Sequence, residues 1–238
     1  MEAGGAHMKM SVAAVPGFLG VVLSFVCVSA VAESPECVAL KTTTIPFAYF
    51  SDVISTDLAK NVSQPKREIK TMVYRTGELE HRFETINIGT GAVVTKGFYF
   101  APLLPRRFEF ADGQPPTVIT YSSMPRDDWY GIKALRYENT TAKENGAKLL
   151  ESTATIAVGA SEKMELSGCE FDVDAIHEEF VDKNPATGKL SVRTIEMLYS
   201  PQLRTALAMT LRTKDDQGGG LYGQTLMTTR IAADPSGR

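Results

Sequence analysis

The alternation of side chains near the C-terminus limits most strongly what this chain can fold into. One set of residues between positions 203 and 213 shares a face: Leu203, Thr205, Leu207, Met209, Leu211 and Thr213. The residues between them form the opposite face: Arg204, Ala206, Ala208, Thr210 and Arg212. A period of two is typical of an antiparallel strand with one buried and one solvated face. The sequence therefore predicts a β-strand over this segment.

A glycine-rich turn follows this strand. Residues 214–220 read KDDQGGG, and glycine adopts the positive φ angles that a tight turn needs. A second segment then places four residues on one face: Leu221, Thr225, Met227 and Ile231. The pattern predicts a hairpin that ends the chain.

Short segments rich in Val, Ile, Thr, Tyr and Phe fill most of the remaining chain, with turn residues between them. They predict strands over 68–76, 82–88, 93–101, 107–110, 117–122, 132–138, 148–158 and 190–199, and over a long segment that starts near Lys163 and is interrupted near 174–176. Asn145-Gly146 and residues 184–188 (NPATG) predict turns. The apolar phase shifts within 190–199, which predicts a β-bulge near Thr194.

A single longer helix is expected over residues 47–60. Val53, Ile54 and Leu58 lie at helical spacing there, and Pro65 follows the segment. Apart from at most one or two short helices, the chain reads as all-β. We predict one β-rich domain over residues 33–238, an antiparallel meander that forms either a barrel or a strongly curved half-barrel sheet.

The first 32 residues have the organisation of a secretory signal peptide. Lys9 precedes an uncharged, largely apolar run, and Ala30-Val31-Ala32 forms a small-x-small cleavage site. Glu2 does not suit the start of such a signal, so Met8 is an alternative first residue. Val26 before Cys27 argues against a lipoprotein signal. We therefore expect export to the periplasm or secretion, and no membrane span after cleavage.

Cleavage after Ala32 would remove Cys27 and leave two cysteines, Cys37 and Cys169. An even pair in an oxidising compartment predicts a disulfide between them. Two separate buried thiols are the alternative.

Charge and motifs exclude several classes of function. The formal net charge is −3, the sequence pI is about 5.7, and the chain has no basic stripe, so nucleic acid is not an expected partner. No G-x-S-x-G elbow occurs. No catalytic residue is assigned, and no cofactor is expected.

An acidic segment is the candidate for a metal site. Residues 169–179 read CEFDVDAIHEE, and a strand would place Glu170, Asp172 and Asp174 on one face, opposite Cys169 and its apolar neighbours. Asp172, Asp174 and His177 could together hold a hard cation. A solvated acidic face is the alternative, because no Ca²⁺-loop or zinc spacing is matched.

Two groups of residues are candidates for ligand binding. The loop around Trp129 and Tyr130 has the aromatic character of a recognition edge, although it could equally anchor the loop in the core. Six apolar residues are candidates to line a concave sheet face, with core packing as the alternative: Phe98, Phe100, Leu207, Met209, Leu211 and Met227.

Three features carry a resemblance to a known group of proteins. They are the export signal, Gly168-Cys169-Glu170-Phe171, and Tyr199-Ser200-Pro201-Gln202-Leu203 between two long strands. The chain resembles uncharacterised exported proteins of Gram-negative bacteria, some of which are similar to the half-barrel periplasmic carriers of lipoproteins. The resemblance implies a curved antiparallel sheet, sometimes with an apolar concavity, and it implies no catalytic residue.

Three functions are compatible with these features. The first is an exported, non-catalytic β-domain with an envelope-associated binding role, including a carrier of an apolar ligand or lipid in a concave sheet. The second is a hydrolase that uses His177 and nearby carboxylates. The third is a structural partner that presents a sheet edge to another envelope protein.

Overall fold

The computed structural model describes residues 33–42, 46–77, 80–101, 103–123 and 129–233. The expected export signal lies outside these residues. The described chain contains two short helices, α1 (Pro35–Thr42) and α2 (Trp129–Ile132), and otherwise strands and turns. The strands are β1 (Phe47–Asp57), β2 (Val62–Ser63), β3 (Arg67–Arg75), β4 (His81–Ile86), β5 (Val93–Ala101), β6 (Leu104–Phe110), β7 (Thr117–Tyr121), β8 (Ala134–Lys143), β9 (Lys148–Leu166), β10 (Cys169–Lys183), β11 (Leu190–Ser200), β12 (Thr205–Asp215) and β13 (Gly220–Ala233).

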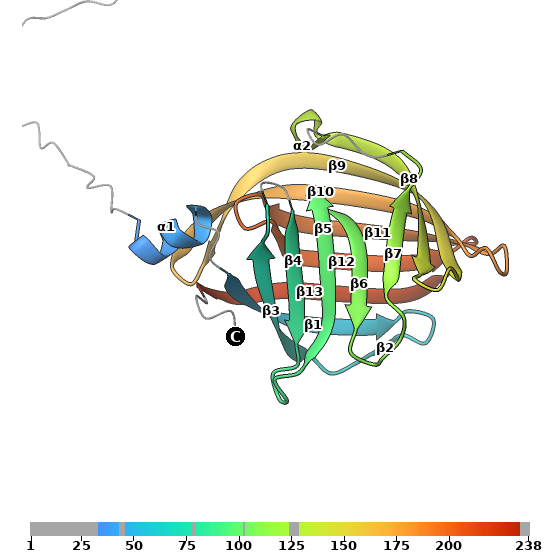
Figure 1. Cartoon of the computed structure of the whole chain (residues 1–238), viewed down its shortest axis with the longest axis horizontal. Helices are drawn as coiled ribbons and strands as arrows, with labels where there is room; N and C mark the ends of the chain where they lie inside the picture. The colour runs from blue at the N-terminus through green and yellow to red at the C-terminus, as the bar shows by residue number, and fades with distance from the viewer. Residues whose placement is uncertain (1–32, 43–45, 78–79, 102, 124–128, 234–238) are drawn as a thin grey trace, which may run out of the picture. The chain divides into compact units, whose positions relative to one another are not determined.

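These strands form a closed antiparallel barrel (Figure 1). From β3 to β13 each strand pairs with the next in sequence, β1 pairs with β3, and β13 returns to pair with β1. Twelve strands close the barrel, and β2 is an additional short strand beside β1. The predicted all-β meander is confirmed, and of its two possible forms the structure has the barrel.

The predicted turns join neighbouring strands of this barrel. Asn145-Gly146 connects β8 to β9, and Gly146 has a φ of 91°. The glycine-rich segment connects β12 to β13, and Gly218 has a φ of 84°. A residue with a side chain would be strained at either position, so these two glycines favour the hairpin turns locally.

Strand β1 occupies the segment for which a helix is predicted, and that prediction is wrong. β1 pairs along its length with β13, and residues 47–53 also pair with β3. Ser51, Val53 and Ser55 alternate as buried residues, whereas Ile54 is 38% exposed. Because the buried face of β1 carries serines as well as Val53, its apolar residues alone do not show the period of two. The apolar residues Val53, Ile54 and Leu58 lie at helical spacing by coincidence.

The long segment around Lys163 is a hairpin of two strands. β9 ends at Leu166, and β10 begins at Cys169 after a turn in which Ser167 and Gly168 both have positive φ angles. The expected interruption is present as a register shift between Asp174 and Ile176 in the β9–β10 pair.

The predicted bulge near Thr194 is wrong. β11 pairs with β10 in continuous register, and its irregularity lies between Leu198 and Tyr199, where it faces β12. The change of apolar phase arises because Leu190, at the start of β11, is 43% exposed.

Helix α1 lies at one end of the barrel, where a disulfide holds it (Figure 1). The Sγ atoms of Cys37 and Cys169 are bonded at 2.04 Å, as predicted. Leu40 of α1 joins Phe171 and Leu207 in a core under the helix. The helix and the disulfide therefore fasten the N-terminus of the described chain to β10.

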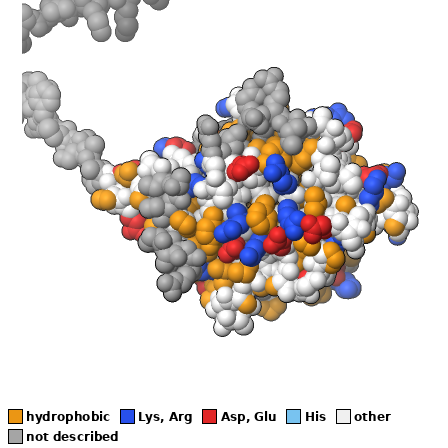
Figure 2. Space-filling model, viewed as in Figure 1, with side chains coloured by type: hydrophobic (Ala, Val, Ile, Leu, Met, Phe, Trp, Pro, Cys, Tyr) orange, Lys and Arg blue, Asp and Glu red, His pale blue; other side chains and the backbone are white. Residues whose placement is uncertain are grey.

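The outer surface of β4–β6 carries charges of both signs. Figure 2 shows Lys and Arg side chains interspersed with Asp and Glu over these strands. Glu84 lies 3.4 Å from Lys96, and Arg107 lies 3.0 Å from Glu109 and 2.6 Å from Glu144. In the described ranges, no helix has the length and apolar character needed to cross a membrane.

Candidate ligand-binding cavity

The barrel encloses a cavity of about 460 Å³. All twelve strands of the barrel contribute residues to its wall, because alternate side chains of each strand point inward. The volume lies within the range of small-molecule binding sites, roughly 300–1,000 Å³. The interior of this barrel is thus not fully packed, and its cavity has the volume of a small-molecule site.

The cavity runs along the barrel from the end that carries α1. His81 and Thr205 line it at that end, where Arg75, the pairing partner of His81, donates to the Leu40 carbonyl of α1. Ile69 and Leu150 line it toward the opposite end. The cavity is therefore elongated in the direction of the barrel axis.

Aromatic rings make up much of the wall. The rings of Tyr99 and His81 stack with centroids 4.7 Å apart, and Phe108 meets Tyr99 edge-on at 6.2 Å. Tyr121 and Tyr137 pack with centroids 5.2 Å apart. Such a wall offers apolar area to a ligand together with a few hydroxyl groups.

Glu178 is the acidic side chain of this wall. It lies on β10 between Ile156 of β9 and Ile195 of β11, and it is only 5% exposed. Within the described chain, no hydrogen bond or ion pair engages its carboxyl group. Burial raises the pKa of Glu178 to about 7, although the charge of Arg193 opposes this shift.

Asp182, the next-but-one inward residue of β10 after Glu178, has a contrasting environment. Its carboxylate accepts a hydrogen bond of 2.5 Å from Ser152 Oγ and lies 3.2 Å from Arg193 Nε. The Arg193 guanidinium also stacks on the Phe180 ring, with its carbon 4.1 Å from the centroid. Arg193 is thus paired with Asp182, whereas the carboxyl group of Glu178 lines the cavity without such a partner among the described residues.

Several tyrosines lie within electrostatic reach of Glu178. Burial raises the pKa of Tyr99, Tyr121 and Tyr137, and the negative charge of Glu178 raises each further. The Tyr121 hydroxyl donates to the Pro105 carbonyl at 2.8 Å. The rings of these tyrosines thus share the cavity wall with the buried carboxyl group.

One of the predicted concave-face residues lines the cavity. Met209 does so, whereas Phe98 and Phe100 do not. Phe98 pairs in register with Arg82 and Arg107 on the neighbouring strands, and the inward residue of this part of β5 is Tyr99. The inward face of β5 carries Gly97 and Tyr99, where the absent side chain of Gly97 makes room for the Phe83 ring, so Phe98 and Phe100 fall on the other face.

The remaining concave-face candidates have different positions. Leu207 is fully buried in the core under α1, Leu211 packs against the second core cluster, and Met227 is 51% exposed. The predicted single face of β12 is divided, because both Ala206 and Met209 line the cavity.

One of the two aromatic loop candidates can be placed. Tyr130 of α2 donates a hydrogen bond of 2.6 Å to Asp174 Oδ2, and its ring packs on the cavity residue Tyr199 at 5.8 Å. Tyr130 itself does not belong to the described cavity wall. Trp129 belongs to α2, and its side chain lies outside the described part.

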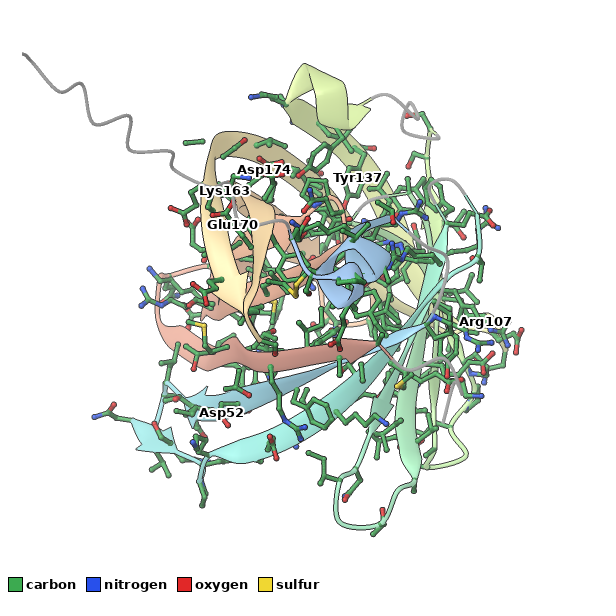
Figure 3. All side chains as sticks on the ribbon, turned by 90° about the vertical axis from the view of Figure 1, so that its left-hand side faces the viewer. Asp52, Arg107, Tyr137, Lys163, Glu170 and Asp174 are labelled. Atoms are coloured by element: carbon green, nitrogen blue, oxygen red, sulfur yellow. A yellow bond between two sulfur atoms is a disulfide. The ribbon has the colours of Figure 1, made fainter. Side chains whose placement is uncertain are left out.

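The structure does not bring the predicted metal ligands together. Lys163 bridges Glu170 and Asp172 at 3.3 and 2.7 Å and holds the pKa of Asp172 below its usual value. Figure 3 shows Lys163, Glu170 and Asp174 at the β9–β10 hairpin. His177 lies 2.6 Å from Glu196 on the outer face. Within the described ranges, no group of three or more His, Cys, Asp or Glu side chains could hold a metal ion.

Glu178 is the site residue that sequence reasoning missed. Ile176, Glu178 and Phe180 alternate with the exposed residues His177 and Glu179. A carboxyl group in phase with apolar neighbours on a strand is the pattern that could have found it.

Comparison with known proteins gives a likeness of structure at very low sequence identity. A hypothetical lipoprotein, YmcC, from Escherichia coli is 6% identical, with a TM-score of 0.42 over 79% of this chain and 89% of that one. A protein with a YmcC-like fold from Bacteroides fragilis is 7% identical, with a TM-score of 0.41 over 78% and 94%. A LolA superfamily protein from Nitrosomonas europaea is 8% identical, with a TM-score of 0.33 over 82% and 89%.

These neighbours are of the kinds that the sequence resemblance names, exported proteins and relatives of lipoprotein carriers. No protein-family model matches the sequence, and no curated protein matches it.

Proposed function

We propose that this protein is an exported, non-catalytic binding protein of the cell envelope that carries an apolar ligand inside its barrel. The observation that carries the proposal is the cavity of about 460 Å³, which is lined mainly by aromatic and aliphatic side chains. Residues 1–32 would supply the export signal.

The size of the cavity supports a binding role over a purely structural one. Protein interiors are close-packed, and their voids are seldom larger than a water molecule. Apolar cavities of about 150 Å³ already bind small aromatic molecules. The present cavity is about three times that volume, so it can take an apolar molecule of substantial size.

An exported carrier also has a physical rationale. Apolar molecules are driven out of water by the hydrophobic effect and need a protein host to cross an aqueous compartment. The strands of the closed barrel surround such a ligand, because every one of them contributes to the cavity wall.

Binding of the neutral fluorophore N-phenyl-1-naphthylamine tests the proposal with two matched variants. Met209→Trp places a bulky ring in the cavity, whereas Met227→Trp places the same ring at an exposed position on the neighbouring strand. We expect saturable fluorescence enhancement with the wild-type protein and with Met227→Trp, and a loss of at least about tenfold in affinity with Met209→Trp.

Two results would contradict the proposal. The first is a wild-type protein that does not bind the fluorophore, and the second is equal binding by the two tryptophan variants. Circular dichroism of both variants verifies that each retains its β-structure.

A further inference from the structure

The cavity contains a buried acid that the barrel itself does not satisfy. Glu178 is 5% exposed, lines the cavity, and has no hydrogen-bond or ion-pair partner in the described chain. Burial of a carboxyl group without a partner is unfavourable, and native proteins seldom retain one without a role. The barrel thus presents a carboxyl group that a ligand could engage.

The neighbouring charged groups do not fill this role. Arg193 on β11 is paired with Asp182. Arg204, at the α1 end of the cavity, donates to the carbonyls of Gly77 and Glu80 at 2.5 and 3.1 Å. The other residues beside Glu178 on β9 and β11 are Ile156 and Ile195, which are apolar.

Aromatic rings line the same cavity as this carboxyl group. Tyr99, Tyr121 and Tyr137 come from β5, β7 and β8 and share the cavity wall with Glu178, and the charge of Glu178 raises the pKa of each. The face of an aromatic ring attracts cations, and cages of such rings recognise quaternary ammonium groups. A carboxyl group and several tyrosine rings that share one apolar cavity are therefore complementary to a positive charge.

We infer that the ligand of this cavity is an amphiphile with an apolar chain and a cationic amine or quaternary ammonium head, which pairs with Glu178. The inference rests on the proposed carrier function and specifies its ligand class. The head lies between Glu178 and the tyrosine rings, and the chain lies along the aliphatic and aromatic remainder of the wall.

Three probes that share a ten-carbon chain test the inference by isothermal titration calorimetry at pH 8. Decyltrimethylammonium carries a fixed positive charge, decan-1-ol is neutral, and decanoate is negative. We expect the cation to bind the wild-type protein at least about tenfold more tightly than the alcohol, because a desolvated ion pair is strong in an apolar site. Decanoate should bind most weakly of the three.

Two variants locate the effect. Glu178→Gln keeps the shape of the side chain and removes its charge, and Glu179→Gln makes the same change one residue later on the exposed face of β10. We expect Glu178→Gln to weaken cation binding at least about tenfold while decan-1-ol binding is unchanged. Glu179→Gln should match the wild-type protein for all three probes.

The pH dependence gives a second test. Affinity for decyltrimethylammonium should rise between pH 5.5 and pH 8 as Glu178 loses its proton, and this rise should be lost in Glu178→Gln. His81 also lines the cavity, so a rise that persists unchanged in Glu178→Gln would belong to another group of the wall and would contradict the inference. A wild-type affinity that does not rise with pH would overturn the inference.

The remaining outcomes separate the inference from the carrier function. If decanoate binds most tightly, the head is anionic and Arg204 is its partner, so the inference is wrong while the carrier function stands. The same holds if the cation and the alcohol bind equally. If no probe binds the wild-type protein, both proposals fail.

Discussion

Glu178 illustrates how a single residue can oppose folding and serve binding. Its carboxyl group is buried among apolar side chains without a partner in the described chain, so it disfavours the folded state whenever it is ionised. A cationic ligand would offset that cost in the bound state. The residue therefore links the stability of the empty barrel to the binding of its ligand.

Stability should depend on pH through Glu178. Burial raises the pKa of Glu178 from its ordinary value of 4.5 to about 7 in the folded protein. The folded state then binds more protons than the unfolded state between these values, so the free energy of unfolding falls as pH rises through this window. The loss approaches about 3 kcal/mol above pH 7, on the order of what such a pKa difference implies.

Urea unfolding of the wild-type protein and Glu178→Gln at pH 5 and pH 8 measures this effect. Other groups titrate equally in both proteins, so the difference between the two isolates Glu178. We expect Glu178→Gln to be more stable than the wild-type protein at pH 8, with a smaller difference at pH 5. A difference that does not change with pH would contradict the prediction.

Tyr199 offers a second test at the scale of the residue. Its hydroxyl oxygen is buried and has no hydrogen-bond partner among the described residues, whereas the hydroxyl of Tyr121 donates to the Pro105 carbonyl. We expect Tyr199→Phe to leave stability unchanged or to raise it by about 1–2 kcal/mol, and Tyr121→Phe to lower it by about 1 kcal/mol. Urea unfolding of the two variants compares them, and a larger loss for Tyr199→Phe would be inconsistent with its environment.

Strand β5 shows how closely the elements of this barrel approach one another. Gly97 lies opposite Phe83 of β4, and a Cβ atom at Gly97 would lie 2.3 Å from Phe83 Cε1. The Phe83 ring lines the cavity and covers Gly97, so the absent side chain makes room for the ring.

Gly97→Ala should therefore displace the Phe83 ring and lower the free energy of unfolding by about 1–3 kcal/mol. Gly89→Ala is the control, because Gly89 lies in an exposed turn and a Cβ there meets no atom closer than 3.4 Å. Chemical denaturation should show a change of at most about 0.5 kcal/mol for the control. Equal effects of the two substitutions would show that the ring does not depend on Gly97.

The sequence predicts best those strands whose apolar residues alone mark the buried face. The boundaries of β5 and the hairpin of β12 and β13 follow from local alternation and glycine-rich turns. β1 escapes prediction because Ser51 and Ser55 share its buried face with Val53. The inward phase of β5 escapes because Gly97, on its inward face, has no side chain that would mark that face as apolar.

Closure of the barrel and the position of the site depend on contacts that are distant in sequence. β1 pairs with β13, and no local pattern specifies that pairing. The tyrosines that share the cavity wall with Glu178 come from β5, β7 and β8, which do not pair with β10, so the sequence alone could not gather them. The disulfide was predictable because removal of the expected export signal leaves two cysteines, and two cysteines in an oxidising compartment can form one pair.

At the scale of the whole molecule, the disulfide constrains the chain over a long loop. Cys37 and Cys169 are 132 residues apart, and closing such a loop stabilises a protein by up to about 4–5 kcal/mol in the chain-entropy model. We expect the double variant Cys37→Ala/Cys169→Ala to lose about 2–4 kcal/mol of unfolding free energy in urea.

Fluorophore binding by the folded double variant should be retained, because neither cysteine belongs to the cavity wall. Reduction of the wild-type protein should reproduce the loss of stability. An unchanged unfolding curve after complete reduction would contradict the assigned role of the disulfide.

The proposed carrier function requires that the ligand lies inside the barrel. Methyl-resolved NMR of the wild-type protein with decan-1-ol measures this directly through nuclear Overhauser effects between the chain and protein methyl groups. We expect contacts with Ile195 and Met209, which line the cavity. Contacts confined to outward methyl groups such as those of Val181 and Met227, or no contacts at all, would contradict the account.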